Sequence, residues 1–273
     1  MLGRILVASG VGAIMIAPLF LYAQSAQESY RYNRITAEYT VNRDGSVDVA
    51  ELFTMFYDGL FRSSWRIIPN TTSSSASTTA TDIVVYDGLT GLALTRSDEP
   101  LDSGNPEDWG KYRSYEQSDG TVVEWAYDTS NIVHTWVVRY TLYNALTADP
   151  DGVVNFSHDI FSDFVAPVDT VEAQVNLPRG IANATATIRT TNQHGSYVDR
   201  PTERSFRFRV SDIEVGETVT IDVGWKKEES TLVSTVVDAL TSNFLPLKDY
   251  FIGALLGFLV FAGTASVLKR RRS

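Results

Sequence analysis

The chain of 273 residues contains no cysteine and only three histidines, His134, His158 and His194. The missing cysteine excludes disulfides, thiolate zinc sites, thiol nucleophiles and a lipidated N-terminal cysteine. The histidines form no HExxH motif and no His-x-His pair, the usual ligands of a hydrolytic zinc ion. A GxSxG elbow, a glycine-rich phosphate loop and an SxxK motif are also missing. We therefore expect a protein that is not an enzyme, with no catalytic residues, no cofactor and no metal.

Basic residues are scarce in the long middle of the chain. Between Glu28 and Asp249, 33 acidic residues stand against 18 basic ones, a balance of −15. A surface this acidic repels the phosphates of nucleic acids and the headgroups of anionic lipids. Nucleic acid is therefore not an expected partner.

Charged residues are rare at both ends, where long apolar runs predict export and membrane anchoring. Tyr250 to Leu268 has no charge over 19 positions, which as a helix span about 28 Å, close to the hydrocarbon core of a bilayer. The basic cluster 269–273 follows directly, and such clusters favour the cytoplasmic side. Arg4 before the apolar run Ile5 to Ala23 is typical of a secretory signal, or of a signal anchor if it is not cleaved.

These ends predict a single-pass protein of the cell membrane, with its body outside and its C-terminal tail in the cytoplasm. The lipid bilayer is then a partner through the C-terminal helix. The expected segments are a signal peptide or signal anchor at 1–25, an extracytoplasmic β-sandwich domain at 27–227, a juxtamembrane helix or linker at 228–246, a transmembrane helix at 247–268 and a basic tail at 269–273.

Alternating apolar residues predict strands throughout the body. The pattern has the period of two expected of half-buried strands, and it occurs at 35–41, 47–56, 122–127, 136–142, 171–177, 206–210 and 219–225. We expect an all-β fold, an antiparallel β-sandwich. Asn70 to Thr81 and Ser97 to Gly110 are too polar for a core and predict loops.

The stretch from Thr40 to Glu51 has two readings. Counting Gly45 as position six of a calcium loop places acidic or amide residues at positions three, five, nine and twelve. Position one is Thr40, however, and both flanks alternate as strands. The Asp44-Gly45 pair instead favours a tight hairpin turn.

Aromatic residues and carboxylates leave a second class of function open. Trp125, Trp136 and Trp225 lie on apolar faces and are expected in the core, whereas Trp109 lies in a loop and is the best candidate for an exposed contact. Paired loop acids such as Asp98-Glu99 and Glu107-Asp108 could serve a glycosidase. The alternative function is therefore a surface glycan-binding module or a hydrolase that uses loop carboxylates.

The apolar C-terminal segment carries a GxxxG motif at Gly253 and Gly257. Small residues at this spacing let two membrane helices approach closely. The motif predicts a helix-packing face and, as an alternative partner, a second copy of the chain or a subunit of a larger membrane complex.

Four motifs in one order resemble a known family. They are DGSVDVAE from Asp44, Arg66-Ile67-Ile68-Pro69, HTWVVRYTLYNAL from His134, and VEAQVNLP from Val171. The chain resembles the N-terminal domain of a prokaryotic predicted-membrane-protein family, domain-of-unknown-function family 2207. Ile67 departs from that family, which usually has an acid there, and Trp136 replaces a common tyrosine. The resemblance implies a fold and a compartment but no catalytic residues.

The leading hypothesis is a membrane-anchored extracytoplasmic β-sandwich with a non-catalytic interaction or structural role at the cell envelope. Its partner would be an envelope protein or a glycan.

Overall fold

The computed structural model describes residues 28–70, 77–161, 164–181, 183–192 and 194–226. The expected signal segment, juxtamembrane helix, transmembrane helix with Gly253 and Gly257, and basic tail lie outside these residues. Within the described ranges, no helix has the length and apolar character needed to cross a bilayer.

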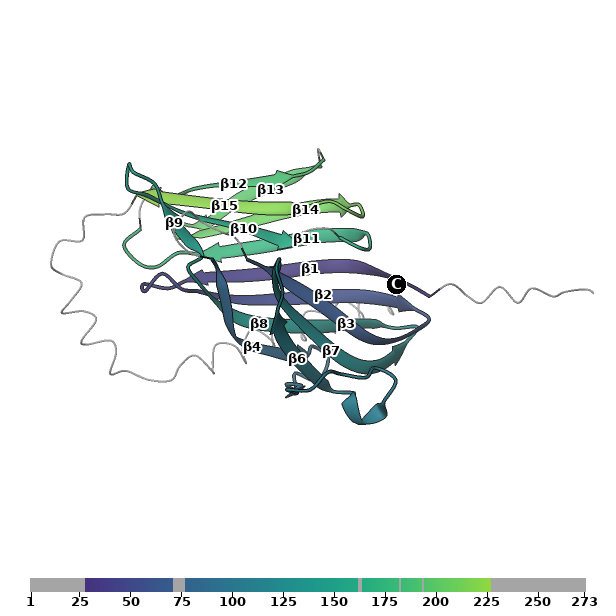
Figure 1. Ribbon diagram of the computed structural model, residues 1–273. Coiled ribbons are helices and arrows are strands. Elements are labelled where there is room, and N and C mark those ends of the chain that lie inside the picture. The colour runs from purple at the N-terminus through teal and green to yellow at the C-terminus, as the bar shows by residue number, and fades with distance from the viewer. Residues whose placement is uncertain (1–27, 71–76, 162–163, 182, 193, 227–273) are drawn as a thin grey trace, which may run out of the picture.

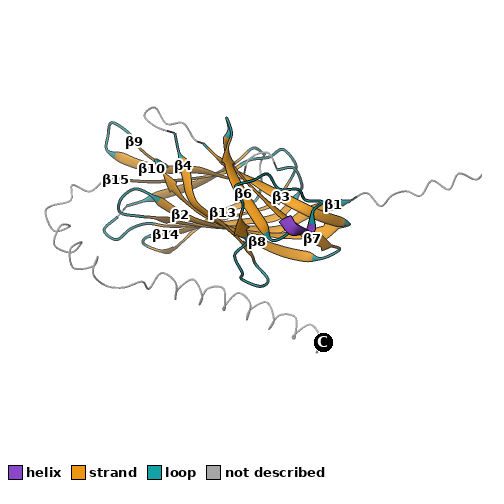
Figure 2. Cartoon of the chain, turned by 60° about the horizontal axis from the view of Figure 1, so that its bottom comes forward, coloured by secondary structure: helices purple, strands orange, loops and turns teal. Residues whose placement is uncertain are grey.

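The described chain is all-β, as expected, with one short 3₁₀ helix (Figure 2). The elements in order are β1 (Ser29–Val41), β2 (Val47–Asp58), β3 (Leu60–Pro69), β4 (Thr79–Asp87), β5 (Thr95–Arg96), η1 (Pro106–Asp108), β6 (Lys111–Glu116), β7 (Gly120–Ser130), β8 (Val133–Tyr143), β9 (Leu146–Ala148), β10 (Val153–Phe161), β11 (Val168–Asn176), β12 (Thr185–Thr190), β13 (Ser196–Thr202), β14 (Ser205–Ile213) and β15 (Val219–Lys226).

Within the described residues, three sheets form two layers. The first layer is a seven-stranded sheet in the order β13-β14-β11-β1-β2-β8-β4. The second layer is split into two four-stranded sheets, β12-β15-β10-β9 and β3-β7-β6-β5. In Figure 1 the former lies over the upper strands of the large sheet and the latter over its lower strands. The result is a sandwich-like arrangement with an interrupted second layer.

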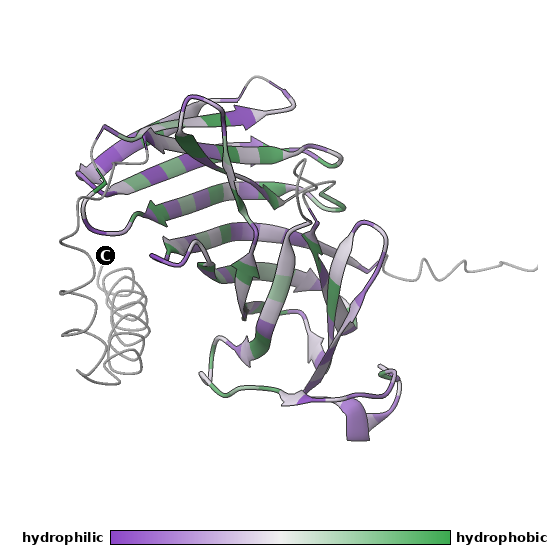
Figure 3. Ribbon diagram, turned by 60° about the vertical axis from the view of Figure 1, so that its left-hand side comes forward, coloured by the Kyte–Doolittle hydropathy of each residue, from purple (hydrophilic) through white to green (hydrophobic). Residues whose placement is uncertain are grey.

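Both small sheets pack on the same face of the large sheet. Tyr39 of β1 contacts Phe156 of β10, with ring centroids 5.4 Å apart. Glu51 of β2 contacts Arg66 of β3, and Glu51 lies directly opposite Ala37 in the register of β1 and β2. Since Ala37 and Tyr39 are two residues apart on one strand, their side chains share a face. Figure 3 shows the hydrophobic and hydrophilic positions alternating along the strands.

Every strand predicted from alternation is present, and the three expected core tryptophans are buried. The turn at residues 42–46 joins β1 to β2, and the Asp44 carboxylate accepts hydrogen bonds from the Ser46 backbone N–H and hydroxyl. The stretch is therefore a hairpin, as the strand pattern favoured, with Gly45 at a φ of 87°.

Two expectations about the body were wrong. The sheets are not wholly antiparallel, because β1 pairs with β11 in parallel and β5 pairs with β6 in parallel. Alternation shows which face of a strand is buried, but not the direction of its neighbour. The polar stretch Asn70 to Thr81 is also not loop throughout, since Thr79 to Thr81 pair with β8. Threonine is β-branched and favours strands despite its polarity.

Candidate functional site

A buried carboxylate interrupts the apolar face of β2. Val49, Glu51 and Phe53 alternate toward the core, and the side chain of Glu51 has no exposure to solvent. A buried carboxylate is stable only when it is paired and hydrogen-bonded. The local strand pattern places Glu51 inward, so its partner has to come from the covering layer.

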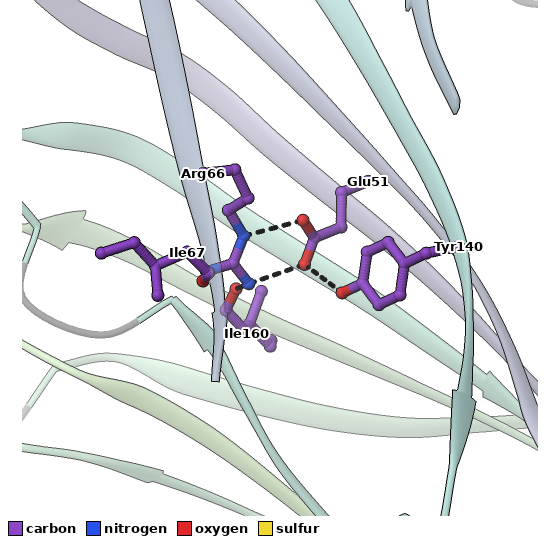
Figure 4. A network of polar contacts seen from close by, with 5 residues as sticks. All are labelled: Glu51, Arg66, Ile67, Tyr140 and Ile160. Atoms are coloured by element: carbon purple, nitrogen blue, oxygen red, sulfur yellow. Dashed lines mark hydrogen bonds and ion pairs between the residues drawn. The ribbon is translucent and has the colours of Figure 1, made fainter. Parts of the chain in front are cut away.

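That partner is Arg66 of β3, whose side chain is 2% exposed. Its Nε donates to Glu51 Oε2 and its Nη2 to Oε1, both at 2.8 Å, in a two-pronged contact (Figure 4). Nη2 also donates to the backbone carbonyl of Ile160 in β10 at 2.8 Å, and Nη1 donates to the carbonyl of Ile67. One guanidinium therefore joins all three sheets.

Tyr140 of β8 completes the network. Its hydroxyl donates to Glu51 Oε1 at 2.9 Å. Burial, followed by the nearby Glu51 carboxylate, raises the pKa of Tyr140, so the hydroxyl stays protonated and can donate. Burial disfavours the charge on Arg66, but the Glu51 carboxylate outweighs this effect and raises the pKa of Arg66. The charges are thus held as a satisfied pair away from solvent.

His158 and Tyr39 lie beside this network with orphaned polar atoms. Both side chains are buried, and their rings are 5.3 Å apart, with His158 also stacked on Phe156. Neither His158 Nε2 nor the Tyr39 hydroxyl has a hydrogen-bond partner among the described residues. Burial, and then the positive charge of Arg66, lowers the pKa of His158 to about 3. His158 is therefore neutral near pH 7.

The other two histidines each approach one carboxylate. His134 Nε2 lies 3.5 Å from Asp87 Oδ2, and burial lowers the pKa of His134. His194 Nε2 lies 2.6 Å from Glu217 Oε2. Desolvation acts against the charge on Glu217, yet hydrogen bonds from the Glu214 backbone, Asn192 and His194 lower its pKa overall. Among the described residues, no three His, Asp or Glu side chains gather into a metal-binding group.

Among the loop carboxylates, Asp108 is engaged within its own loop. Asp108 accepts hydrogen bonds from the Asp102 backbone N–H and from Lys111, which lower its pKa. A carboxyl group with a lowered pKa is unsuited to donate a proton as a general acid. Asp98, Glu99 and Glu107 are exposed.

Trp109 is only half-buried, and its surroundings hold it in place. Its Nε1 donates to the Ser103 carbonyl at 3.0 Å, and the Arg62 guanidinium lies 5.5 Å from its ring centroid. A contact with a partner through Trp109 remains a prediction. Trp65 of β3 is the more accessible tryptophan, at 53% exposure. Sequence reasoning missed Trp65 because the segment LFRSSWRIIP does not alternate strictly between apolar and polar residues. The one signal in the sequence is a tryptophan placed between the polar residues Ser64 and Arg66.

Trp65 borders a shallow hollow of about 350 Å³ on the outer face of the β3-β7-β6 sheet. Tyr115 and Ile67 supply further apolar surface there, and Glu124 and Gln117 supply polar groups. Arg113 lies against the Tyr115 ring, 4.4 Å from its centroid, and pairs with Glu124. The hollow can bind a ligand that is partly apolar and partly hydrogen-bonding.

The Glu51–Arg66 pair gives a first prediction. Arg66→Met should lower the free energy of unfolding by about 3–5 kcal/mol, because it leaves a buried carboxylate without its cation. The free energy of unfolding is measured by urea denaturation of the full chain in detergent, with tryptophan fluorescence as the signal. As a control, Arg189→Met removes a surface pair with Asp222 and should cost less than about 1 kcal/mol. Equal losses in the two variants would contradict a special role for the buried pair.

His158 gives a prediction about pH. In the unfolded chain its pKa is about 6.5, whereas in the folded protein it is about 3. At pH values between these two, His158 binds a proton in the unfolded chain but not in the folded protein. The free energy of unfolding therefore falls as the pH is lowered, by up to about 1.4 kcal/mol per pH unit. His158→Phe should remove that contribution from the slope of unfolding free energy against pH between 4 and 6.

The matched control for His158 is Phe156→Leu, which disturbs the same aromatic stack without removing a titrating group. Its slope should equal that of the parent chain. If His158→Phe also keeps the parent slope, His158 titrates alike in both states and the neutral buried assignment is wrong.

Solved structures resemble the fold only distantly. One is a putative nutrient binding protein from Legionella pneumophila, with 9% identity, a TM-score of 0.44, and coverage of 71% of this chain and 66% of that one. Another is a putative protease from Parabacteroides distasonis, with 8% identity, a TM-score of 0.39, and coverage of 71% and 40%. A third is native leukotriene A4 hydrolase from Saccharomyces cerevisiae, with 9% identity and a TM-score of 0.43. The match covers 75% of this chain and 31% of that one.

The chain thus spans well under half the length of the last two proteins, and at these TM-scores the likenesses carry no inference. No curated protein matches the chain in sequence. A family model does match, over residues 31–225, and it includes all the residues of the Glu51–Arg66 network. The chain belongs to the family described as predicted membrane protein (DUF2207) N-terminal domain.

Proposed function

We propose that this protein is a membrane-anchored, extracytoplasmic β-sandwich with a non-catalytic interaction or structural role at the cell envelope. The family description as a membrane protein supports the compartment. The apolar segments 1–25 and 247–268 support a signal peptide or signal anchor and a single C-terminal transmembrane helix, with 228–246 as the link and 269–273 in the cytoplasm.

The Glu51–Arg66 network is the observation that carries the non-catalytic role. It unites residues from three of the four family-like motifs, Glu51, Arg66 and Tyr140. Both carboxylate oxygens accept hydrogen bonds, and the charged side chains have almost no contact with solvent. A catalytic acid or base has to reach a proton on its substrate. The motif residues fit a scaffold that holds sheets in place.

Topology is tested by protease protection on intact cells or spheroplasts, with tags at both ends of the chain. We expect digestion of the body and protection of the C-terminal tag, because the basic cluster 269–273 favours the cytoplasmic side. A protected body would overturn the extracytoplasmic assignment. Turnover of an envelope polymer by the purified chain, lost on substitution of a carboxylate, would overturn the non-catalytic role.

A glycan-binding module is the second candidate, and the exposure of Trp65 favours it. An aromatic ring with polar neighbours such as Glu124 and Gln117 suits a sugar, which presents both C–H faces and hydroxyl groups. If this role is correct, binding on a glycan array should fall at least about tenfold in Trp65→Ala, the loss expected for one buried aromatic contact. Tyr197→Ala, which removes a similarly exposed ring (55%) on β13 outside the hollow, is the matched control and should keep binding. Silence of the parent chain on the array would remove this candidate.

A further inference from the structure

Among the residues that the structure describes, one edge of β3 has no neighbouring strand. Within them β3 is the terminal strand of its sheet and pairs only with β7. Asn70 N–H donates to the Asp119 carbonyl in continuation of this ladder, which places the even-numbered residues opposite β7. In an antiparallel pair, alternate residues direct both backbone groups to the same side. Ser63, Trp65 and Ile67 therefore present theirs to the open edge.

At the open edge of β3, two of the three outward backbone carbonyls already accept a hydrogen bond, whereas among the described residues the outward N–H groups do not donate one. The carbonyl of Ser63 accepts from the Tyr127 hydroxyl at 3.1 Å, and the carbonyl of Ile67 accepts from Arg66. The N–H groups of Ser63, Trp65 and Ile67 have no hydrogen-bond partner within the part of the chain that the structure describes. An exposed row of backbone N–H groups is a template for an added strand.

A groove runs beside this edge. Its volume is about 770 Å³, and β3 lines it from Leu60 to Pro69. Its apolar lining from the large sheet is Tyr30, Tyr32, Met55 and Tyr57, while Val165 adds a further apolar side chain. Leu60 and Val165 are exposed although both are apolar. Such a surface next to an unpaired edge fits alternate apolar side chains of an extended segment.

Acidic residues stand at the two ends of the groove. Glu28 lies against Gly59 at the start of β3, and Asp119 lies opposite Asn70 just beyond its end. Both are exposed, and among the described residues neither has an ion-pair partner. The basic residues of the lining are already neutralised, Arg62 by Asp128 and Arg66 by Glu51. The groove therefore favours a basic residue near each end of its ligand.

We propose that the open edge of β3 binds an extended peptide segment of a partner protein as an added strand. The segment presents apolar side chains at alternate positions to the groove and a lysine or arginine near each end. The ten residues of β3 offer about 33 Å of edge. The inference rests on the interaction role proposed above and names the surface and the chemistry of the partner.

The charges disfavour a second copy of this chain as the occupant. Antiparallel pairing of two β3 edges would bring Glu28 of one copy toward Asp119 of the other at both ends. Like charges that face each other across paired strands are destabilising. A peptide with basic ends meets the same carboxylates with opposite charge.

Selection from a phage-displayed library of random nonapeptides, on the full chain in phosphatidylcholine nanodiscs, tests the proposal. We expect enrichment of alternating apolar sequences with basic ends. When an enriched synthetic peptide binds, amide exchange should slow at Ser63, Trp65 and Ile67. Exchange at Ser64, Arg66 and Ile68 should stay as it was, because these residues face β7. No enrichment, or binding without this alternating protection, would overturn the proposal.

Variants of the edge make the test specific. Ile67→Pro removes one outward N–H, leaves the ladder to β7 in place and should weaken the peptide at least about tenfold. Ile67→Val, which keeps the N–H, should bind like the parent chain. If Ile67→Pro does not fold, the surface double variant Glu28→Lys/Asp119→Lys replaces it and should weaken the peptide to a similar degree. Parent-like binding in the folded edge variant would refute strand addition.

Two further measurements exclude the other occupants. Since the chain has no cysteine, Ser63→Cys gives a single thiol, and a specific disulfide-linked dimer in nanodiscs would assign the edge to a second copy. Glycan binding that is lost in Trp65→Ala, together with a peptide selection that enriches nothing, would make the hollow beside Trp65 the binding surface in place of the edge. All these measurements use purified protein, so a failed topology in cells and a failed peptide selection are distinguishable.

Discussion

The pairing of Glu51 with Arg66 is the contact on which the relative placement of the three sheets depends. Taking two charges out of water costs several kcal/mol per ion, and good geometry with further hydrogen bonds is needed to offset that cost. Here the carboxylate belongs to the large sheet, the guanidinium to one small sheet and the carbonyl of Ile160 to the other. The hydrophobic effect has no preferred direction, whereas the hydrogen bonds of this network fix the atoms that meet across the layers.

A neutral counterpart of this network lies under the same small sheet. The Tyr57 hydroxyl receives hydrogen bonds from Trp136 Nε1 and from the Tyr127 hydroxyl, both at 3.0 Å. Tyr57 and Trp136 belong to the large sheet and Tyr127 to the sheet that covers it. The Trp125 and Trp136 rings pack nearby with centroids 6.0 Å apart. Directional contacts inside an apolar core thus hold the β3-β7-β6-β5 sheet at two points.

Much of the fold could be predicted from the sequence, because one-sided burial leaves a period of two in β1, β2, β8, β11 and β15. The site could be predicted only in part. Glu51 falls on the apolar face of its strand, which signals a buried partner, but Arg66 lies in a segment without clean alternation. Their meeting depends on how separate sheets stack, and neither local pattern encodes that. Trp109 was singled out for its loop, while Trp65, on an edge strand, is the more accessible ring.

The parallel pairing of β1 with β11 imposes an order on folding. Tyr32 lies opposite Val168, more than 130 positions later in the chain, and both strands are central in the large sheet. As the chain is synthesised from its N-terminus, β1 can pair with β2 early but lacks its other neighbour until β11 has emerged. Contacts between residues so far apart are slow to form, and unpaired central strands are prone to aggregate. A chain truncated before β11 is therefore expected to aggregate, because the edge of β1 that β11 covers in the full chain is left unpaired.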